Sequence, residues 1–178
     1  MLHSIRATAI LTAGLFLLRG APGARAEDEE ETHEPQPKPA APAVPISTPE
    51  GAKIEQSRQF CRSHNFAEAL RVLGEARAMK LEPAHASEVL FEIANTYFGQ
   101  GQESIEGKIS GVDAEASLRE AAKLFGELVK TYPQAARASR SAYMIGSSHL
   151  LLDDLDASLA AYQRAFDDFP RSDDRAGA

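Results

Sequence analysis

Apolar residues recur every three or four positions along most of the chain after residue 47. Within "FAEALRVLGEA", for example, Phe66, Ala69, Leu73 and Ala76 fall on one face of a helix. This spacing matches the 3.6-residue period of an α-helix, and no segment alternates with the period of two that is typical of a strand. The pattern therefore predicts an all-α fold. The expected helices cover residues 49–63, 66–80, 84–100, 113–131, 135–152 and 155–168.

Polar residues with capping side chains precede the first two helices. Either Ser47 or Thr48 can cap the first helix, since a hydroxyl accepts a hydrogen bond from a free N–H of the first turn. Asn65 can cap the second helix, and a glutamate follows it three residues later. These signals separate the first two helices at a short turn.

Two later helices end on the same pair of residue types, Tyr132-Pro133 and Phe169-Pro170, which lie 37 residues apart. Proline stops a helix because it lacks the N–H that the hydrogen-bond ladder needs. Upstream, each helix pair carries small residues that let its helices approach and larger ones that fill the groove between pairs. These positions are Phe60, Ala69, Leu73, Ala76 and Pro83 in the first pair, Leu90, Ile93, Ala94, Tyr97, Ala121 and Phe125 in the second, and Ala142, Ile145, Gly146, His149, Ser158, Tyr162 and Ala165 in the third.

On these positions, residues 48–172 resemble the tetratricopeptide repeat family. The resemblance implies a short α-solenoid of about three helical hairpins. The chain departs from the family pattern at Gln56-Ser57, where Leu-Gly is usual, and in a polar insert at about residues 101–115, which is either a loop or an extension of the flanking helices. The "YP" and "FPRS" endings and the "AYMIG" helix are similar to repeats of bacterial envelope members of the family. Such members include the periplasmic coordinator of the Tol-Pal system and the outer-membrane-assembly lipoprotein.

The resemblance also implies a partner-binding groove, lined by the first helix of each hairpin. The positions that match the family's groove-facing residues are Arg58, Arg62, Phe91, Asn95, Phe98, Arg140, Tyr143 and Ser147. Arginines beside aromatic side chains suit an extended peptide with acidic groups. Two alternatives stay open: the aromatic residues belong to the hairpin core, and the arginines pair with nearby glutamates, which are Glu55, Glu88 and Glu92.

The last helix is a second candidate surface, carrying Tyr162, Phe166 and Phe169. These residues belong to a hairpin that no further repeat follows in the sequence, because only "RSDDRAGA" comes after Pro170. Polar residues of the helix could make it a cap. Otherwise its apolar side docks a partner protein or a second copy, or the chain is the front part of a longer protein.

The first 26 residues have the layout of a secretory signal peptide. Basic residues precede an uncharged apolar run at residues 7–18, and Ala24-Arg25-Ala26 supplies a cleavage site, so cleavage is expected after Ala26. The twelve residues of the run are fewer than the roughly 20 that span a bilayer. The expected location is therefore periplasmic or secreted, with retention by an uncleaved N-terminal anchor as the alternative.

The composition between the signal and the helices differs from both. Residues 27–47 are acidic and then proline-rich, which predicts an extended, disordered linker, and residues 173–178 form a short tail. The signal segment holds three arginines and no acid, so its removal lowers the formal net charge from −7 to −10. A chain that acidic disfavours nucleic acid and anionic membranes as partners.

No catalytic, cofactor-binding or metal-binding constellation is expected. Ser147, Ser148 and His149 are adjacent on a helix and point about 100° apart, so they do not form a nucleophile and its base. Cys61 is the only cysteine, which excludes an intramolecular disulfide. The sequence therefore predicts an exported, non-enzymatic scaffold that binds a protein or peptide in the bacterial cell envelope. A self-associating structural subunit and an enzyme subunit without a recognisable site remain the alternatives.

Overall fold

The computed structural model describes residues 45–170, which belong to one compact unit. These residues form six helices and no strand, which confirms the predicted all-α class and the short solenoid of three hairpins. The helices are α1 (Pro49–Arg62), α2 (Phe66–Arg77), α3 (Pro83–Ile105), α4 (Ala114–Thr131), α5 (Ala138–Leu151) and α6 (Leu155–Asp168). The predicted signal peptide, residues 27–44 of the linker and the tail lie outside the described residues.

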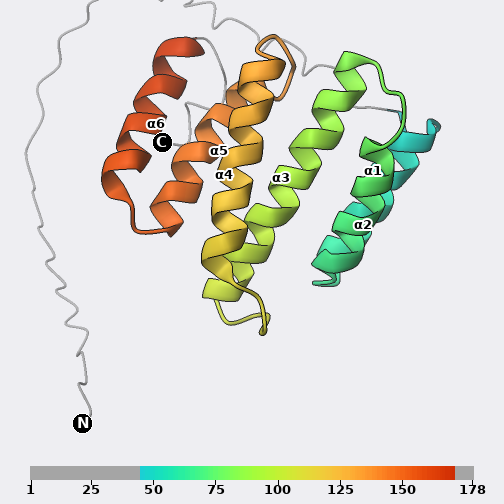
Figure 1. Ribbon diagram of the computed structural model, residues 1–178, viewed down its shortest axis with the longest axis horizontal. Helices are drawn as coiled ribbons and strands as arrows, with labels where there is room; N and C mark the ends of the chain where they lie inside the picture. The colour runs from blue at the N-terminus through green and yellow to red at the C-terminus, as the bar shows by residue number, and fades with distance from the viewer. Residues whose placement is uncertain (1–44, 171–178) are drawn as a thin grey trace, which may run out of the picture. The chain divides into compact units, whose positions relative to one another are not determined.

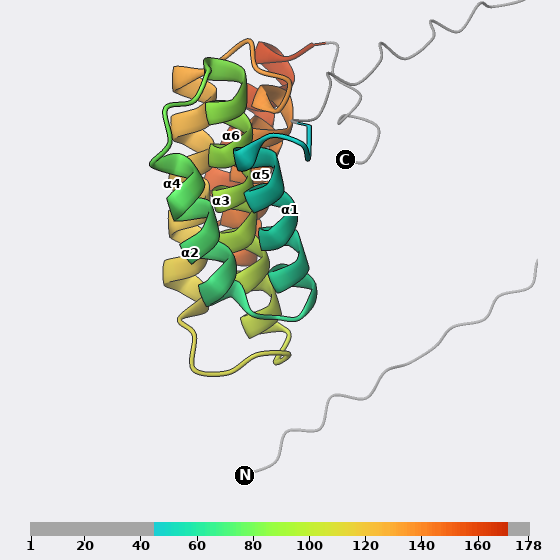
Figure 2. The same cartoon turned by 90° about the vertical axis from the view of Figure 1, so that its right-hand side faces the viewer.

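The helices form three hairpins that are stacked in chain order (Figure 1). Hairpin 1 is α1 and α2, hairpin 2 is α3 and α4, and hairpin 3 is α5 and α6. The first helices of the hairpins also contact one another, α1 with α3 and α3 with α5. They form an inner layer, and in the view of Figure 2 α2 and α4 appear toward the left and α1 toward the right.

Hairpins 1 and 3 share the same tight turn between their helices. His64 and Asp153 both have a φ of 59°, the left-handed conformation that reverses the chain after a helix. The next residue of each turn, Asn65 or Asp154, accepts a hydrogen bond from the backbone N–H three residues on, at 3.3 and 3.2 Å. The predicted capping role of Asn65 is confirmed, and the repeat is visible in backbone geometry as well as in sequence.

Hairpin 2 has a longer connection, which the sequence left open between a loop and helix extension. Both occur: α3 continues to Ile105, five residues beyond the expected end at 100, and a loop then leads to α4. Gly107 and Gly111 have φ values of 71° and 76° in this loop, a conformation that costs glycine nothing. The insert therefore lengthens the end of one hairpin and leaves the stack of hairpins continuous.

The two aromatic-proline endings have matching geometry. Tyr132 ends α4 with φ −129° and ψ 58°, and Phe169 ends α6 with φ −125° and ψ 62°. Each donates its N–H to the carbonyl four residues earlier, on Leu128 or Ala165. The following proline cannot continue the ladder, so the same residue pair ends both helices in the same way.

Large apolar side chains from all three hairpins form one continuous core. Leu73, Val89, Phe125 and Leu128 are almost completely buried, and the Phe125 ring lies 5.8 Å from the ring of Phe91. Burial of this kind supplies most of the stability of a small helical domain, because isolated helices of this length are marginal in water. None of the helices in residues 45–170 is long and apolar enough to cross a membrane.

Replacing Gly146 with alanine is expected to lower the free energy of unfolding by about 1–3 kcal/mol. A Cβ at this position would lie 2.6 Å from two ring carbons of Tyr162, and that ring is held by Tyr143 and by a hydrogen bond to Ser147. Gly74 is the matched control, since a Cβ there meets nothing within 4 Å. Its replacement with alanine should raise stability by about 0.5–1 kcal/mol through helix propensity. Urea unfolding of both variants checks the difference, and equal shifts would contradict the close packing of α5 on α6.

Candidate partner-binding surfaces

Ion pairs between arginines and buried glutamates connect the inner layer of helices. Arg58 on α1 donates from Nε to Glu92 Oε1 on α3 at 3.1 Å, and its Nη2 lies 3.5 Å from Glu88 Oε1. The two glutamates are only 7% and 6% exposed, so their charges need partners inside the protein. Arg58 is a predicted groove residue, and its pairing with these carboxylates agrees with the alternative that the sequence left open for it.

A second arginine completes this cluster from the other side. Arg137, which directly precedes α5, donates from Nε and Nη2 to the two oxygens of Glu88, both at 2.9 Å. Its guanidinium carbon also lies 4.9 Å from the centre of the Phe91 ring, which places a cation over an aromatic face. Arg58, Glu88, Glu92 and Arg137 are called the inner ionic cluster below. Sequence reasoning missed Arg137, because only the fold brings it beside a residue 49 positions away.

The other predicted groove residues on α1 and α3 divide into packed and exposed ones. Phe91 is buried against Phe125, and Phe98 is partly buried and packs against the core. Both placements agree with the alternative that the aromatic residues belong to the hairpin core. Arg62 pairs with Glu55 on its own helix at 3.0 Å and is otherwise exposed. Asn95 is exposed on α3.

The predicted groove residues on α5 differ in exposure and contacts. Arg140 is exposed and forms no ion pair with the residues between 45 and 170. Tyr143 stacks at 4.9 Å on Tyr162 of α6, and Ser147 shares a hydrogen bond of 3.0 Å with the Tyr162 hydroxyl. Burial raises the pKa of Tyr162. The inner surface open to a partner therefore consists of Arg62, Asn95 and Arg140 around the inner ionic cluster.

The predicted terminal surface on α6 is partly open. Phe166 is 56% exposed, whereas Tyr162 and Phe169 are half-buried, and Phe169 packs against the core. Two residues that the sequence reasoning did not single out are more exposed than these aromatic residues. Leu155 and Leu159 leave 61% and 70% of their surface open to water, so with Phe166 helix α6 carries three of the exposed large apolar side chains in residues 45–170.

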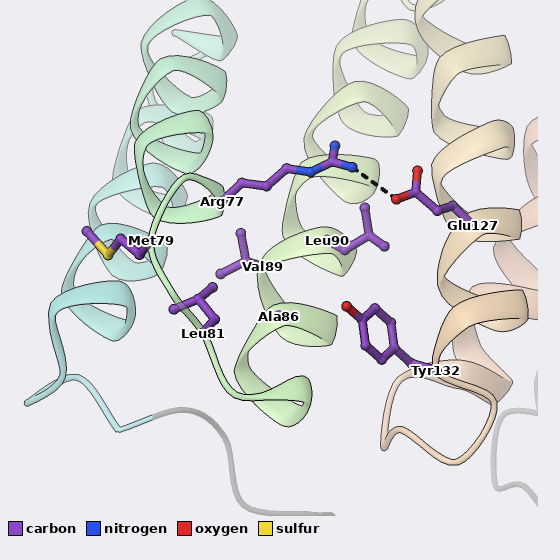
Figure 3. A pocket seen from close by; sticks show the side chains of 8 residues that line it. All are labelled: Arg77, Met79, Leu81, Ala86, Val89, Leu90, Glu127 and Tyr132. Carbon is purple, nitrogen blue, oxygen red and sulfur yellow. Dashed lines mark hydrogen bonds and ion pairs between the residues drawn. The ribbon is translucent and has the colours of Figure 1, made fainter.

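A pocket of about 230 Å³ lies on the outer side, between α2, α3 and α4 (Figure 3). Its apolar lining comes from the α2–α3 connection and the start of α3, and the rest from α2 and the end of α4. Arg77 Nη2 and Glu127 Oε1 join across it at 2.9 Å. No sequence signal indicated the pocket, because it depends on the spacing of α2 and α4. The lining residues are Arg77, Met79, Leu81, Ala86, Val89, Leu90, Glu127 and Tyr132.

The described residues contain little that suits catalysis or metal binding. No group of three His, Cys, Asp or Glu side chains in residues 45–170 is placed to hold a metal ion. Cys61 is half-buried with its Sγ 3.7 Å from Thr96 Oγ1, and burial raises the pKa of its thiol. A thiol with a raised pKa is a weak nucleophile at neutral pH. The surroundings of Cys61 are those of a packing residue.

The third hairpin carries the strongest likeness to a known family. Residues 140–172 match the tetratricopeptide repeat. The match covers nearly all of α5, all of α6 and the aromatic-proline ending, and it supports a tetratricopeptide family for this chain. No curated protein matches the chain.

Hairpins 1 and 2 share features with the hairpin that matches the tetratricopeptide repeat. Hairpin 1 shares the left-handed turn of the matched hairpin, and hairpin 2 shares its aromatic-proline ending. Stacked repeats of this kind form extended surfaces that bind other proteins. The fold and the match together indicate a protein–protein interaction scaffold.

Proposed function

We propose that the protein is an exported, non-enzymatic scaffold that binds a partner protein or peptide in the bacterial cell envelope. The observation that carries the proposal is the continuous stack of three hairpins, of which residues 140–172 match the tetratricopeptide repeat. Such a stack offers a preformed surface, so a partner binds without ordering the scaffold first. The envelope members to which the endings are similar, including the Tol-Pal coordinator, are the kind of protein that we propose here.

Export is supported by the N-terminal sequence alone. A basic start, an apolar run and the Ala24-Arg25-Ala26 site are typical of a cleaved signal peptide. If the proposal is right, the chain expressed in a Gram-negative host is recovered from the periplasm with Glu27 as its first residue. N-terminal sequencing of the recovered protein is the measurement. A chain that stays in the cytoplasm with Met1 intact would rule out export, and one that stays in the membrane would favour the anchor.

The inner surface is the proposed binding face. The inner ionic cluster contains two arginines and two glutamates and has no net charge. The charge that a partner meets on this face therefore comes from the exposed residues around the cluster. Arg140 is such a residue, and Arg62 exposes 64% of its side chain despite its pair with Glu55. These arginines suit acidic groups of a partner at the rim of the interface.

Charge reversal tests this face directly. The variant Arg62→Glu with Arg140→Glu is compared with the wild-type chain by chemical cross-linking in periplasm and mass spectrometry of the linked partners. We expect loss of partners that the wild type retains. The matched control is Arg119→Glu with Lys130→Glu, which makes the same charge change on the exposed side of α4. Identical partner sets for all three proteins would remove the inner surface from the proposal.

A further inference from the structure

Helix α6 carries a row of exposed apolar side chains. Leu155, Leu159 and Phe166 are 61%, 70% and 56% exposed, and spacings of four and seven residues place them on one face of the helix. Half-buried Tyr162 lies within the same row. Leu155, Leu159, Tyr162 and Phe166 are called the α6 stripe below. A contiguous apolar row on a small acidic protein is the kind of surface that marks an interaction site.

The position of Leu155 is buried in the second helices of the other hairpins. Ala69, Ala121 and Ser158 align as the small residue of each repeat, and three residues earlier stand Phe66, Leu118 and Leu155. Phe66 is 5% exposed and Leu118 is completely buried, whereas Leu155 is 61% exposed. Leu118 and Leu155 are the same residue type, so the difference in their exposure comes from the place of α6 in the stack.

The next helix along the chain explains the burial in hairpin 1. A Cβ at Gly99 of α3 would lie 3.4 Å from the Phe66 ring, so α3 runs directly over that residue. In the same way α5 packs against α4. Helices α2 and α4 are thus each covered by the helix that follows them in the chain. Within residues 45–170, α6 is the one second helix without such a cover. The open face of α6 therefore corresponds to the face that an α-helix covers in hairpins 1 and 2.

The charge beside the α6 stripe also restricts which partner can bind there. At 100° per residue, Asp156 and Asp167 flank the stripe on one side, with Gln163 between them, and the other side packs on α5. Gln163 donates to Asp167 at 3.0 Å, and neither aspartate forms an ion pair with the described residues. Arg164, the only basic residue of α6, lies on the opposite side of the helix. The open flank is therefore negative.

We propose that the α6 stripe binds an amphipathic α-helix of a partner protein, whose apolar row is bordered by lysine or arginine residues. Leu155, Leu159 and Phe166 would pack against the apolar row, as α3 packs on α2 within this chain. Asp156 and Asp167 would face the basic border. The inference rests on the proposed scaffold function but names a surface separate from the inner layer.

A second copy of the chain fits the same surface less well. Antiparallel pairing of two stripes sets Leu155 opposite Phe166 and Leu159 opposite Tyr162 of the other copy. The same register brings Asp156 of one copy near Asp167 of the other, because flanks of the same side meet in an antiparallel pair. Like charges at an apolar contact oppose association. A basic partner removes this repulsion.

The test uses a synthetic helical peptide of about 18 residues with leucine along one face and lysine beside it. It is added to the ¹⁵N-labelled chain, and amide shifts are mapped while fluorescence anisotropy gives the affinity. We expect shifts centred on residues 155–167 and at least about tenfold weaker binding for Leu159→Asp and for Asp156→Lys with Asp167→Lys. Ile105→Asp is the matched control, since Ile105 is 53% exposed on α3, and it should bind like the wild type. A peptide with glutamate in place of lysine should bind at least about tenfold more weakly.

The other outcomes overturn either the α6 site or the scaffold function on which it rests. Absence of binding, shifts on α1 and α3, or an unchanged affinity for Leu159→Asp would exclude the α6 stripe as the site. A dimer of the chain alone in sedimentation equilibrium that Leu159→Asp converts to a monomer would identify a second copy as the occupant. If Leu159→Asp keeps all envelope partners of the wild type, the scaffold function stands and the α6 site falls. If the wild type captures no partner, the scaffold function fails, whatever the peptide does.

Discussion

The variant Phe125→Ala is expected to unfold with a free energy about 3–5 kcal/mol below that of the wild type. The Phe125 side chain is completely buried, its ring contacts that of Phe91, and it belongs to the core that all three hairpins share. Truncation removes the transfer free energy of the ring and leaves a cavity that helices on both sides cannot close. Urea unfolding followed by circular dichroism at 222 nm measures the change.

The control for this substitution is Phe166→Ala, which removes the same atoms from a ring that is 56% exposed. We expect its effect to stay below about 1 kcal/mol. If the two variants lose similar stability, the core is not centred on Phe125. A loss for Phe125→Ala below about 1 kcal/mol would contradict the packing of α4 between α3 and α5.

The variant Arg137→Met should lose about 2–4 kcal/mol of stability, although methionine is a good helix former of similar length. It removes both hydrogen bonds to Glu88 and the cation over the Phe91 ring, and Glu88 is only 7% exposed. The carboxylate keeps Arg58 at 3.5 Å, which limits the loss below that of a fully unpaired charge. Thermal and urea unfolding at neutral pH give the value.

A neighbouring arginine provides the comparison. Arg140→Met changes an exposed arginine three residues later, and its effect should stay within about 0.5 kcal/mol. Replacing Glu88 with methionine in the Arg137→Met background should recover part of the loss, because no unpaired carboxylate remains buried. A double variant that is less stable than Arg137→Met would show that Glu88 is stabilised mainly by Arg58.

The local structure of this chain can be predicted closely from its sequence. The cap at Asn65 and the stops at Pro133 and Pro170 depend on neighbours a few residues away, and the structure shows them where they were expected. Helix α3 extends beyond residue 100, its expected end, to Ile105. Gly99 and Gly101 lie inside the helix, and a Cβ on Gly101 would meet the Leu118 side chain at 2.6 Å. That close approach is a property of the packed hairpin and has no local signature.

The candidate surfaces are harder to predict from the sequence, because each residue's role depends on distant partners. Arg58 and Arg140 look alike along the chain, yet Arg58 is tied to Glu92 on another helix and Arg140 is exposed. The sequence marks the aromatic residues of α6 but not Leu155 and Leu159, and at the Leu155 position the other hairpins carry buried apolar residues. Such a residue is buried only where another helix of the stack covers it.

The inner ionic cluster has a mechanical consequence. In most repeat arrays each repeat interacts with its neighbours alone, so every junction can bend on its own. Here Glu88 in hairpin 2 touches Arg58 of hairpin 1 and Arg137 of hairpin 3, so one carboxylate contributes to both junctions. Opening either junction disturbs the charge balance at the other. The two junctions of the stack are thereby coupled through one buried carboxylate, so loosening of one hairpin weakens the contacts of the next.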